Sequence, residues 1–295
     1  MNKHIISYLI RHCLTWLPDK LYLQLLFKVE LGYWLNLKKP KTFSEKIQWL
    51  KLYGFKSEYT KMVDKVAVKN IVASKIGFEH IIPTLGIWNN FDEINFDTLP
   101  ERFVLKTSHG GGGGGVVVCP DKNLFDKNNA RKVINKSLRK DISRSYREKP
   151  YHDVPRCILA EKYLTNGLDK DLPDYKFYCF NGEPHYCQVI RDRHSKETID
   201  FYDMEWKHQK FVGLNPTAQN GQSPVACPIN FKTMQNICRQ LAKNIPFVRI
   251  DLYEVNSQVY FGEITFYPAS GMGKFTPNVW NNLLGDLIIH KRPSL

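Results

Sequence analysis

The sequence lacks the cysteine patterns that define disulfide-rich and zinc-binding proteins. Its seven cysteines are an odd number and include no C-x-x-C pair, so they do not form a disulfide or zinc framework. Reduced thiols in a cytosolic protein fit this pattern best. We therefore expect a cytoplasmic protein without structural disulfides.

We also expect neither a secretion signal nor a membrane span. The N-terminal stretch is basic, and Arg11 and His12 interrupt its apolar run. It has no small-residue cleavage site and no run near the roughly 18 apolar residues that a spanning helix needs. Apolar residues at helical spacing within 3–35 instead predict two helices, the second opened by Pro18. We expect these helices to pack on the rest of the protein; a basic amphipathic segment on anionic lipid is the alternative.

Nucleic-acid motifs and two common nucleotide-binding fingerprints are absent. The chain has 42 Lys and Arg against 29 Asp and Glu, a net charge of +13. These cations are spread along the chain without a basic block, so we expect no nucleic-acid partner but an anionic substrate or a membrane surface. Neither a Walker A sequence nor a Rossmann glycine pattern accompanies the glycine run described next.

Six consecutive glycines, 110–115, join a strand that ends in Lys106 to a second strand at 116–118. So many glycines do not form a stable strand or helix interior. They form a loop whose backbone N–H groups can approach an anion without hindrance from a Cβ atom. The pattern favours a glycine-rich hairpin that folds over a nucleotide, and a plain flexible hairpin is the alternative.

A second predicted hairpin, within 247–273, places two acids opposite each other. If Val255 pairs with Val259 across a three-residue loop, Asp251 lies opposite Glu263 with both side chains on one face. Two carboxylates that close repel each other unless a cation lies between them. A shared Mg²⁺ that bridges to substrate phosphates satisfies this requirement, whereas solvated acids on a surface hairpin are the alternative.

Helices and strands alternate along the remaining chain. Thr42 with Glu45 three residues later forms a capping box that begins a helix. The further expectations are a helix from about Asp64 to Gly77, a short strand near 81–88, a basic helical region at 121–149, a strand at 156–164 carrying Glu161, a hairpin turning at Asn181-Gly182, an irregular segment at 200–228, a helix near 230–244 and a short closing helix after Trp280.

Taken in order, these landmarks resemble the ATP-grasp superfamily, and above all its TupA-like branch, named for teichuronopeptide biosynthesis and found in surface-polysaccharide (capsule) clusters. The matching stretches are KTFSEKIQWLKLY, DKVAVKNIVASKIG, IIPTLGIW, FVLKTSHGGG, ILAEKYL, DYKFYCFNGEP, FVRIDLYEV and FGEITFYPASG. The resemblance covers residue 40 to about residue 285 and implies an α+β, ATP-grasp fold in which two α+β subdomains clasp ATP. On this basis we divide the chain into a helical N-terminal region (1–62), a linker with the first ATP-grasp elements (63–100), a glycine-loop subdomain (101–165) and a C-terminal subdomain with the metal-site hairpin (166–295).

The resemblance implies ATP and Mg²⁺ as cofactors and assigns residues to them. The implied nucleotide-binding residues are Lys65, Lys106, Ser108, His109, Gly110, Gly111, Gly112, Gly113, Glu161 and Lys176. Lys65 and Lys106 would contact the α- and β-phosphates, and Glu161 would hold the adenine or ribose. Asp251, Glu263 and Thr265 would bind Mg²⁺, although Thr265 stands where many ATP-grasp ligases have Asn, which leaves the number of ions open. Arg249 and Lys106 would stabilise the charge that develops during phosphoryl transfer.

The implied activity is ATP-dependent joining of a carboxylate to an amine through an acyl phosphate. The expected acid is a uronic acid of a surface polysaccharide, or a polyglutamate chain, and the expected amine is an amino acid or amino alcohol. The acceptor would be an acidic saccharide or lipid-linked glycan at the inner face of the plasma membrane. Candidates to hold the substrate carboxylate are Arg191, Arg193 and Lys274, together with His109 and Lys176.

Three other functions stay open at this point. A glycosyltransferase could use the paired acids and a metal to hold a sugar nucleotide, but it would not need the two lysines and the glycine hairpin. A kinase would stop after the phosphorylation step. A non-catalytic protein of the membrane surface would not need Lys65, Lys106, Asp251 and Glu263 together.

Overall fold

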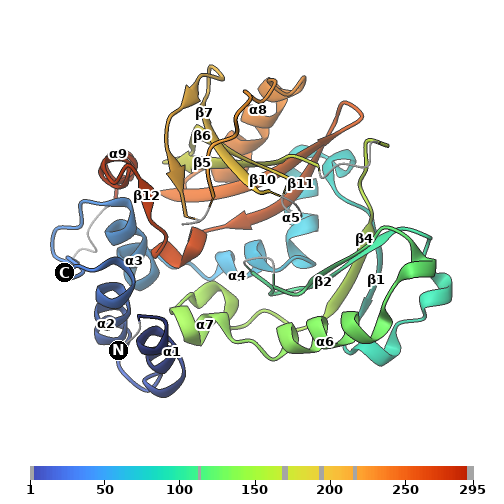
Figure 1. Ribbon diagram of the computed structural model, residues 1–295, viewed down its shortest axis with the longest axis horizontal. Helices are drawn as coiled ribbons and strands as arrows, with labels where there is room; N and C mark the ends of the chain where they lie inside the picture. Colours follow the sequence, from blue (N-terminus) through green and yellow to red (C-terminus); the bar gives the residue numbers. More distant parts are fainter. Residues whose placement is uncertain (1–2, 112–113, 168–171, 193–195, 215–217, 291–295) are drawn as a thin grey trace.

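The computed structural model describes residues 3–111, 114–167, 172–192, 196–214 and 218–290. Figure 1 shows two antiparallel sheets with α4 (Glu58–Val63) and α5 (Ala67–Ile76) between them. The other α-helices are α1 (Lys3–Cys13), α2 (Asp19–Leu31), α3 (Phe43–Tyr53), α6 (Lys127–Leu138), α7 (Ile142–Tyr146), α8 (Phe231–Ala242) and α9 (Val279–Leu287). The α+β class expected from the sequence is confirmed.

The N-terminal helices form a separate small core. Pro18 precedes α2, and Gly32 ends it in the left-handed conformation that glycine adopts without strain. The buried side chains shared by α1, α2 and the following loop are Ile10, Tyr22, Leu23, Leu26, Phe27 and Leu35. The capping box of α3 is confirmed: Thr42 Oγ1 accepts from the Glu45 N–H at 3.1 Å, and the Thr42 N–H donates to the Glu45 carboxylate at 3.0 Å.

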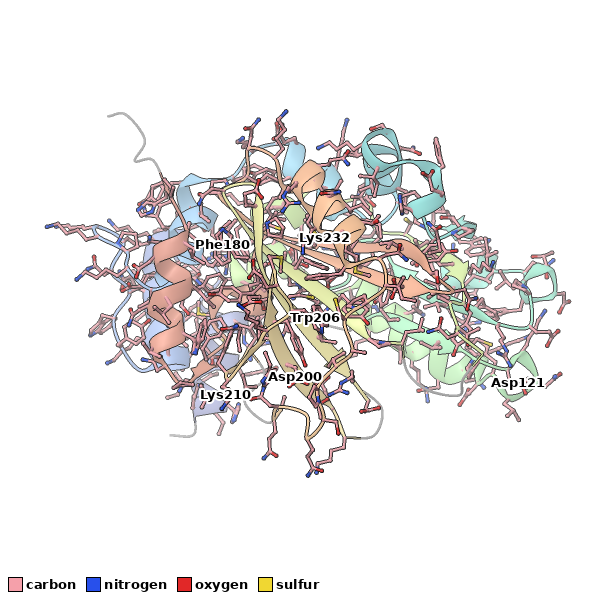
Figure 2. All side chains as sticks on the ribbon, turned by 90° about the horizontal axis from the view of Figure 1, so that it is seen from above. Asp121, Phe180, Asp200, Trp206, Lys210 and Lys232 are labelled. Atoms are coloured by element: carbon pink, nitrogen blue, oxygen red, sulfur yellow. The ribbon has the colours of Figure 1, made fainter. Side chains whose placement is uncertain are left out.

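The smaller sheet contains four strands in the order β1-β4-β2-β3. Their bounds are β1 (Thr84–Trp88), β2 (Phe103–Thr107), β3 (Val116–Cys119) and β4 (Ile158–Lys162). Phe103, Leu105 and Ile158 are fully buried on the face that α6 covers, and they form a core of their own with Ile134 of that helix. In Figure 2, Asp121, just after β3, marks this end of the molecule, away from Phe180 and Trp206 of the other sheet's core.

The larger sheet has the order β11-β10-β5-β6-β7-β8. Its strands are β5 (Asp174–Phe180), β6 (Glu183–Arg191), β7 (Thr198–Asp203), β8 (His208–Gln209), β10 (Phe247–Val255) and β11 (Gln258–Thr265), and β9 (Val212–Gly213) pairs separately with β12 (Phe275–Thr276). All seven residues of β5 are buried, as expected of a strand inside a sheet that α8 covers on one face.

The irregular segment predicted at 200–228 was wrong at its start. Residues 198–203 form β7, paired with β6 from Tyr186↔Asp203 to Arg191↔Thr198. Phe201 is fully buried in this strand. This strand forms because β6 supplies its hydrogen bonds and the core buries its aromatic rings, and neither cause can be read from the local sequence. The prediction of an irregular segment was based on the glycines and prolines that follow the strand.

The pairing of Asp251 with Glu263 is confirmed, but the predicted loop was wrong. Val255 pairs with Gln258, so the turn has two residues, Asn256 and Ser257. Their φ angles are 50° and 61°, as in the turns that suit the twist of a hairpin. A bulge then leaves Gly262 unpaired between Leu252↔Phe261 and Asp251↔Glu263. The residue gained at the bulge compensates for the residue lost from the loop.

All seven cysteines are free. In the described ranges, the helices are all too short or too polar to cross a bilayer.

Candidate active site

Several of the predicted functional residues contact one another next to α4 and α5, the helices that lie between the two sheets in Figure 1. Lys65, in the short link between these helices, connects the two sides. Its ammonium group lies 3.8 Å from Glu263 of the larger sheet and also contacts the carbonyl of Gly110 in the glycine loop. Burial lowers the pKa of Lys65, against the attraction of Glu263.

Lys176, Asp251 and Glu263 form a row across β5, β10 and β11. The backbone register pairs Asp251 with Lys176 on one side and with Glu263 on the other. Antiparallel partners project to the same face, so one lysine and two acids meet there. Lys176 forms ion pairs with Asp251 and, at 2.7 Å, with Asp174.

Arg249 holds the two acids together from the next row of the same face. Its Nε donates to Asp251 Oδ1 at 2.7 Å, and its Nη2 donates to Asp251 Oδ2 at 2.8 Å. The same Nη2 lies 2.9 Å from Glu263 Oε1 and 3.1 Å from Thr265 Oγ1. A planar guanidinium suits this forked contact, and a lysine could not replace it.

The pKa values of the two acids are shifted in opposite directions. Burial and the negative charge of Glu263 raise the pKa of Asp251 to about 6, against the attraction of Arg249 and Lys176. Burial also acts to raise the pKa of Glu263, but Lys65 and Arg249 outweigh it and lower that pKa to about 2. Divergent pKa values in a close pair of acids are typical of functional sites.

A second ion-pair group lies on the smaller sheet. Glu161 of β4 is 5% exposed and lies 2.6 Å from both Lys106 of β2 and Lys69 of α5. Lys69 also donates to the carbonyl of Ile82 at 2.8 Å. Burial would raise the pKa of Glu161, but Lys106 and Lys69 lower it.

Lys69 is the residue of this group that the sequence interpretation missed. It stands four residues after Lys65, a spacing that puts both on one side of a helix. That spacing could have identified it. Glu161 therefore bridges two lysines in addition to the nucleotide role that the resemblance implies for it.

The glycine loop closes on itself at its base. The Thr107 N–H donates to Gly115 O at 3.0 Å, and the Lys65 N–H donates to Ser108 O at 3.0 Å. At Gly115, with φ of 85°, an added Cβ would lie 2.1 Å from Ser137 Oγ, so this position requires glycine. Gly111 also belongs to the described part of the loop, whereas Gly112 and Gly113 lie outside the described residues.

The side chains of Ser108 and His109 bind backbone groups near the smaller sheet. Ser108 Oγ donates to Pro155 O at 2.5 Å and accepts from the Cys157 N–H at 3.1 Å. His109 is 3% exposed, and its Nε2 lies 3.1 Å from Ser137 O. Burial lowers the pKa of His109, so the ring is neutral and donates from Nε2. In this structure the His109 ring holds the backbone at Ser137, and its use for a substrate carboxylate stays a prediction.

Of the predicted carboxylate-binding arginines, the structure describes Arg191. Arg191, at the end of β6, donates to Asp200 Oδ2 and to Ser223 O, both at 3.1 Å. Asp200 is labelled in Figure 2, on the β7 side of the larger sheet. Arg191 thus fixes a loop in this structure, and its assignment to the substrate stays a prediction. Arg193 lies outside the described residues, and Lys274 is exposed beside β12.

The donor set fits Mg²⁺. Across the described residues, His, Cys, Asp and Glu side chains nowhere gather in threes as a metal cluster. Asp251, Glu263 and the Thr265 hydroxyl supply hard oxygen ligands instead, with a 3.3 Å contact between Thr265 and Glu263. Mg²⁺ typically takes one or two carboxylates and completes its shell with water and substrate phosphates.

The model of the family described as TupA-like ATPgrasp matches residues 45–289. A search of curated proteins gives no match.

Several solved structures show a distant likeness. A D-alanine–D-alanine ligase from Bacillus anthracis is 16% identical, with a TM-score of 0.43, over 77% of this chain and 66% of that chain. An N5-carboxyaminoimidazole ribonucleotide synthetase, purK, in complex with ADP is 14% identical, with a TM-score of 0.42, over 75% and 50%. A RimK domain ATP-grasp protein from Sphaerobacter thermophilus is 10% identical, with a TM-score of 0.40, over 78% and 69%. The matches to the first two ligases thus span two thirds or less of those proteins.

Proposed function

The chain belongs to the TupA-like ATP-grasp family and has the ATP-grasp fold, and from this premise we propose that it is an ATP-dependent ligase. The reaction forms a C–N bond between a carboxylate and an amine. The substrate acid is a uronic acid of an acidic surface polysaccharide, or a polyglutamate chain. The amine is an amino acid or an amino alcohol.

One arrangement carries this proposal. Lys65 lies between Gly110 of the glycine loop and Glu263 of the acid pair. A lysine that can bind a triphosphate and the acids that can bind the accompanying Mg²⁺ thus lie together between the two sheets. Phosphoryl transfer needs positioning and charge stabilisation more than covalent help from the protein, and this site offers both.

Each side chain has a separate part in the reaction. Lys65 and Lys106 bind phosphate oxygens, and Glu161 orients Lys106. Asp251 and Glu263, with Thr265 beside them, would hold Mg²⁺, which when bound neutralises phosphate charge. Arg249 stabilises the charge that develops on the transferred phosphoryl group.

The reaction balances without any further reactant. The substrate carboxylate attacks the γ-phosphorus, ADP leaves, and an acyl phosphate forms. The amine then attacks the acyl carbon, an amide forms, and phosphate and a proton leave. Burial of the site limits the competing hydrolysis of the acyl phosphate by water.

An acidic substrate agrees with the charge of the chain. The net charge of +13 attracts a polyanion to the protein over long distances. Family membership favours ligation over glycosyl transfer. A kinase would share the ATP site, so the chemical product has to separate the two activities.

The test is release of ADP from Mg-ATP with a panel of uronic-acid saccharides and polyglutamate, with and without a mixture of amino acids. We expect ADP and phosphate only when an acid and an amine are both present. The product should gain the mass of the amine less one water. A phosphorylated product from the acid alone would establish a kinase, and turnover of a sugar nucleotide would establish a transferase.

Glu263→Gln is the matched variant for this assay. It removes a carboxylate ligand while it preserves the volume of the side chain, so the fold should survive. We expect turnover to fall by at least about 10²-fold, as when one strong electrostatic contact to a transition state is lost. Wild-type turnover in this variant would overturn the metal assignment.

A further inference from the structure

Exposed large apolar side chains are concentrated in the N-terminal segment. Of the eighteen exposed large apolar side chains in the described ranges, seven lie within residues 5–34. These seven are Ile5, Tyr8, Leu9, Trp16, Leu21, Tyr33 and Trp34. A soluble surface usually scatters such residues singly, and a concentration of them marks an interaction surface.

Helix α1 has two apolar faces. Ile10 is 5% exposed and packs in the N-terminal core, with Ile6 beside it. Ile5, Tyr8 and Leu9 follow helical spacing on the other side and are 52%, 57% and 40% exposed. The inner face is sufficient to hold the helix in place, so the outer face is available for a partner.

Exposed aromatic rings and positive charge occur in the same segment. Trp16 is 72% exposed and Trp34 is 60% exposed. Residues 1–41 contain seven Lys and Arg against two Asp and Glu, a net charge of +5 in that short segment. Tryptophan and tyrosine prefer the interface between lipid and water, and lysine is attracted to anionic headgroups.

A hollow in this surface is lined by both kinds of side chain. It has a volume of about 380 Å³ and lies between α2, the loop after it and the end of α3. Lys20, Lys38, Trp34 and Tyr53 line it. The Lys28 ammonium lies 5.6 Å from the centre of the Trp34 ring. The cations and aromatic rings of this surface suit the binding of an anionic headgroup.

We propose that α1, α2 and the loop to residue 41 form a docking surface for an anionic phospholipid bilayer. Helix α1 would lie in the plane of the interface, with Ile5, Leu9 and Trp16 inserted at the level of the headgroups. Both helices lie at one end of the molecule, away from the four-stranded sheet (Figure 1). This docking surface does not depend on the chemistry proposed for the active site.

Vesicle co-sedimentation of the full chain tests this surface. The vesicles are phosphatidylcholine alone, or phosphatidylcholine mixed with phosphatidylglycerol. We expect binding to the mixed vesicles that weakens as salt increases, because the attraction is partly electrostatic. Equal binding to both vesicle types, or binding to neither, would overturn the proposal.

The double variant Leu9→Ser/Trp16→Ser tests which residues insert. We expect at least a tenfold loss of vesicle affinity, because each large apolar side chain that leaves water contributes to binding. The matched control is Leu124→Ser/Ile229→Ser, two side chains that are each 83% exposed outside the N-terminal helices; it should bind as wild type. Both variants should keep the wild-type melting temperature.

Two outcomes would assign the surface to a different partner. If an acidic saccharide releases the protein from vesicles at constant ionic strength, the surface is a saccharide site. If wild type self-associates without vesicles and the double variant stays monomeric, the surface is an interface between two copies of the chain. Either result would overturn the bilayer assignment.

Discussion

At the scale of single residues, Glu161 shows how one carboxylate can organise two cations. It lies 2.6 Å from both Lys106 and Lys69, on a strand between β1 and β2. A buried acid with two partners is stable only while both are present. In the proposed function, this ion pair would hold Lys106 in place before the nucleotide binds, which would reduce the cost of binding.

The substitution Glu161→Gln should make the free energy of unfolding less dependent on pH in the acidic range. The two lysines lower the pKa of Glu161 below its ordinary value of 4.5 in the folded protein. Its contribution to stability is therefore full above the unfolded pKa and is lost as the pH falls through the folded pKa. At pH 7 the variant should lose about 1.5–3 kcal/mol of unfolding free energy. This difference should shrink below pH 4.5, and urea denaturation at several pH values measures it.

Lys106→Ala should weaken nucleotide binding. The variant removes one cation from the phosphates, and we expect the Kd for ATP to rise at least tenfold, about 1.4 kcal/mol. Isothermal titration calorimetry measures the affinity. Lys132→Ala, an exposed lysine on α6, is the control for the change in net charge. An ATP affinity equal to that of the control would remove Lys106 from the site.

At the scale of elements, the hairpin of β10 and β11 determines which side chains reach the site. A one-residue slip would turn Glu263 to the other face of the sheet. The two-residue turn alone would produce that slip, and the bulge at Gly262 corrects it. The bulge is therefore needed to place Asp251 and Glu263 opposite each other.

We expect Gly262→Ala to disturb this register. A Cβ atom there would lie 2.9 Å from the Tyr253 ring and 3.0 Å from the carbonyl of Asp251. The crowding should cost about 1–3 kcal/mol of unfolding free energy and should lower turnover further by moving Glu263. Thermal melting and the ADP assay measure the two effects.

The control on the same hairpin is Ser257→Gly. Ser257 has a φ of 61°, which glycine adopts without strain. Stability and turnover should therefore stay at wild-type levels. Equal effects of the two substitutions would show that the bulge has no special part in the site.

The elements that could be predicted from the sequence are those with a strong local signal. The Thr42 capping box, the Asn181-Gly182 turn and the alternation in β10 each depend on neighbouring residues. Strand β7 and the bulge at Gly262 depend on pairing with distant strands, and no local pattern shows them. The Asp251–Glu263 pairing was predicted correctly because two errors cancelled: the loop was predicted one residue too long, and the bulge was not predicted. The alternating pattern of the strands therefore did not by itself determine this pairing.

The residues of the site were also only partly predictable from the sequence. The residue pattern selected Lys106, Asp251 and Glu263, and the family resemblance added Lys65, which lies 3.8 Å from Glu263. Arg191 had equally suitable chemistry, but Asp200 binds it elsewhere. A sequence shows which residues can bind an anion. Only the fold shows which acid each of them contacts: Glu263 for Lys65, Glu161 for Lys106 and Asp200 for Arg191.

At the scale of the whole molecule, the link between α4 and α5 couples the two sheets. Lys65 contacts the glycine loop and the acid pair, and Lys69 contacts Glu161. The cores of the two sheets are otherwise separate clusters. A ligand held by both sides should therefore stabilise the molecule as a unit.

Mg-ATP should raise the melting temperature of the wild type more than ATP with a metal chelator. At a ligand concentration one hundred times the Kd, binding adds about 2.7 kcal/mol of stability. In Glu263→Gln the lysines that bind phosphates remain, so ATP alone should still stabilise the variant. The extra increment from Mg²⁺ should disappear, because the carboxylate that would hold the ion is gone. Thermal melting with ATP, with and without Mg²⁺, measures both increments. A full Mg²⁺ increment in the variant would place the ion on other ligands and leave Glu263 as a partner of Lys65 and Arg249 alone.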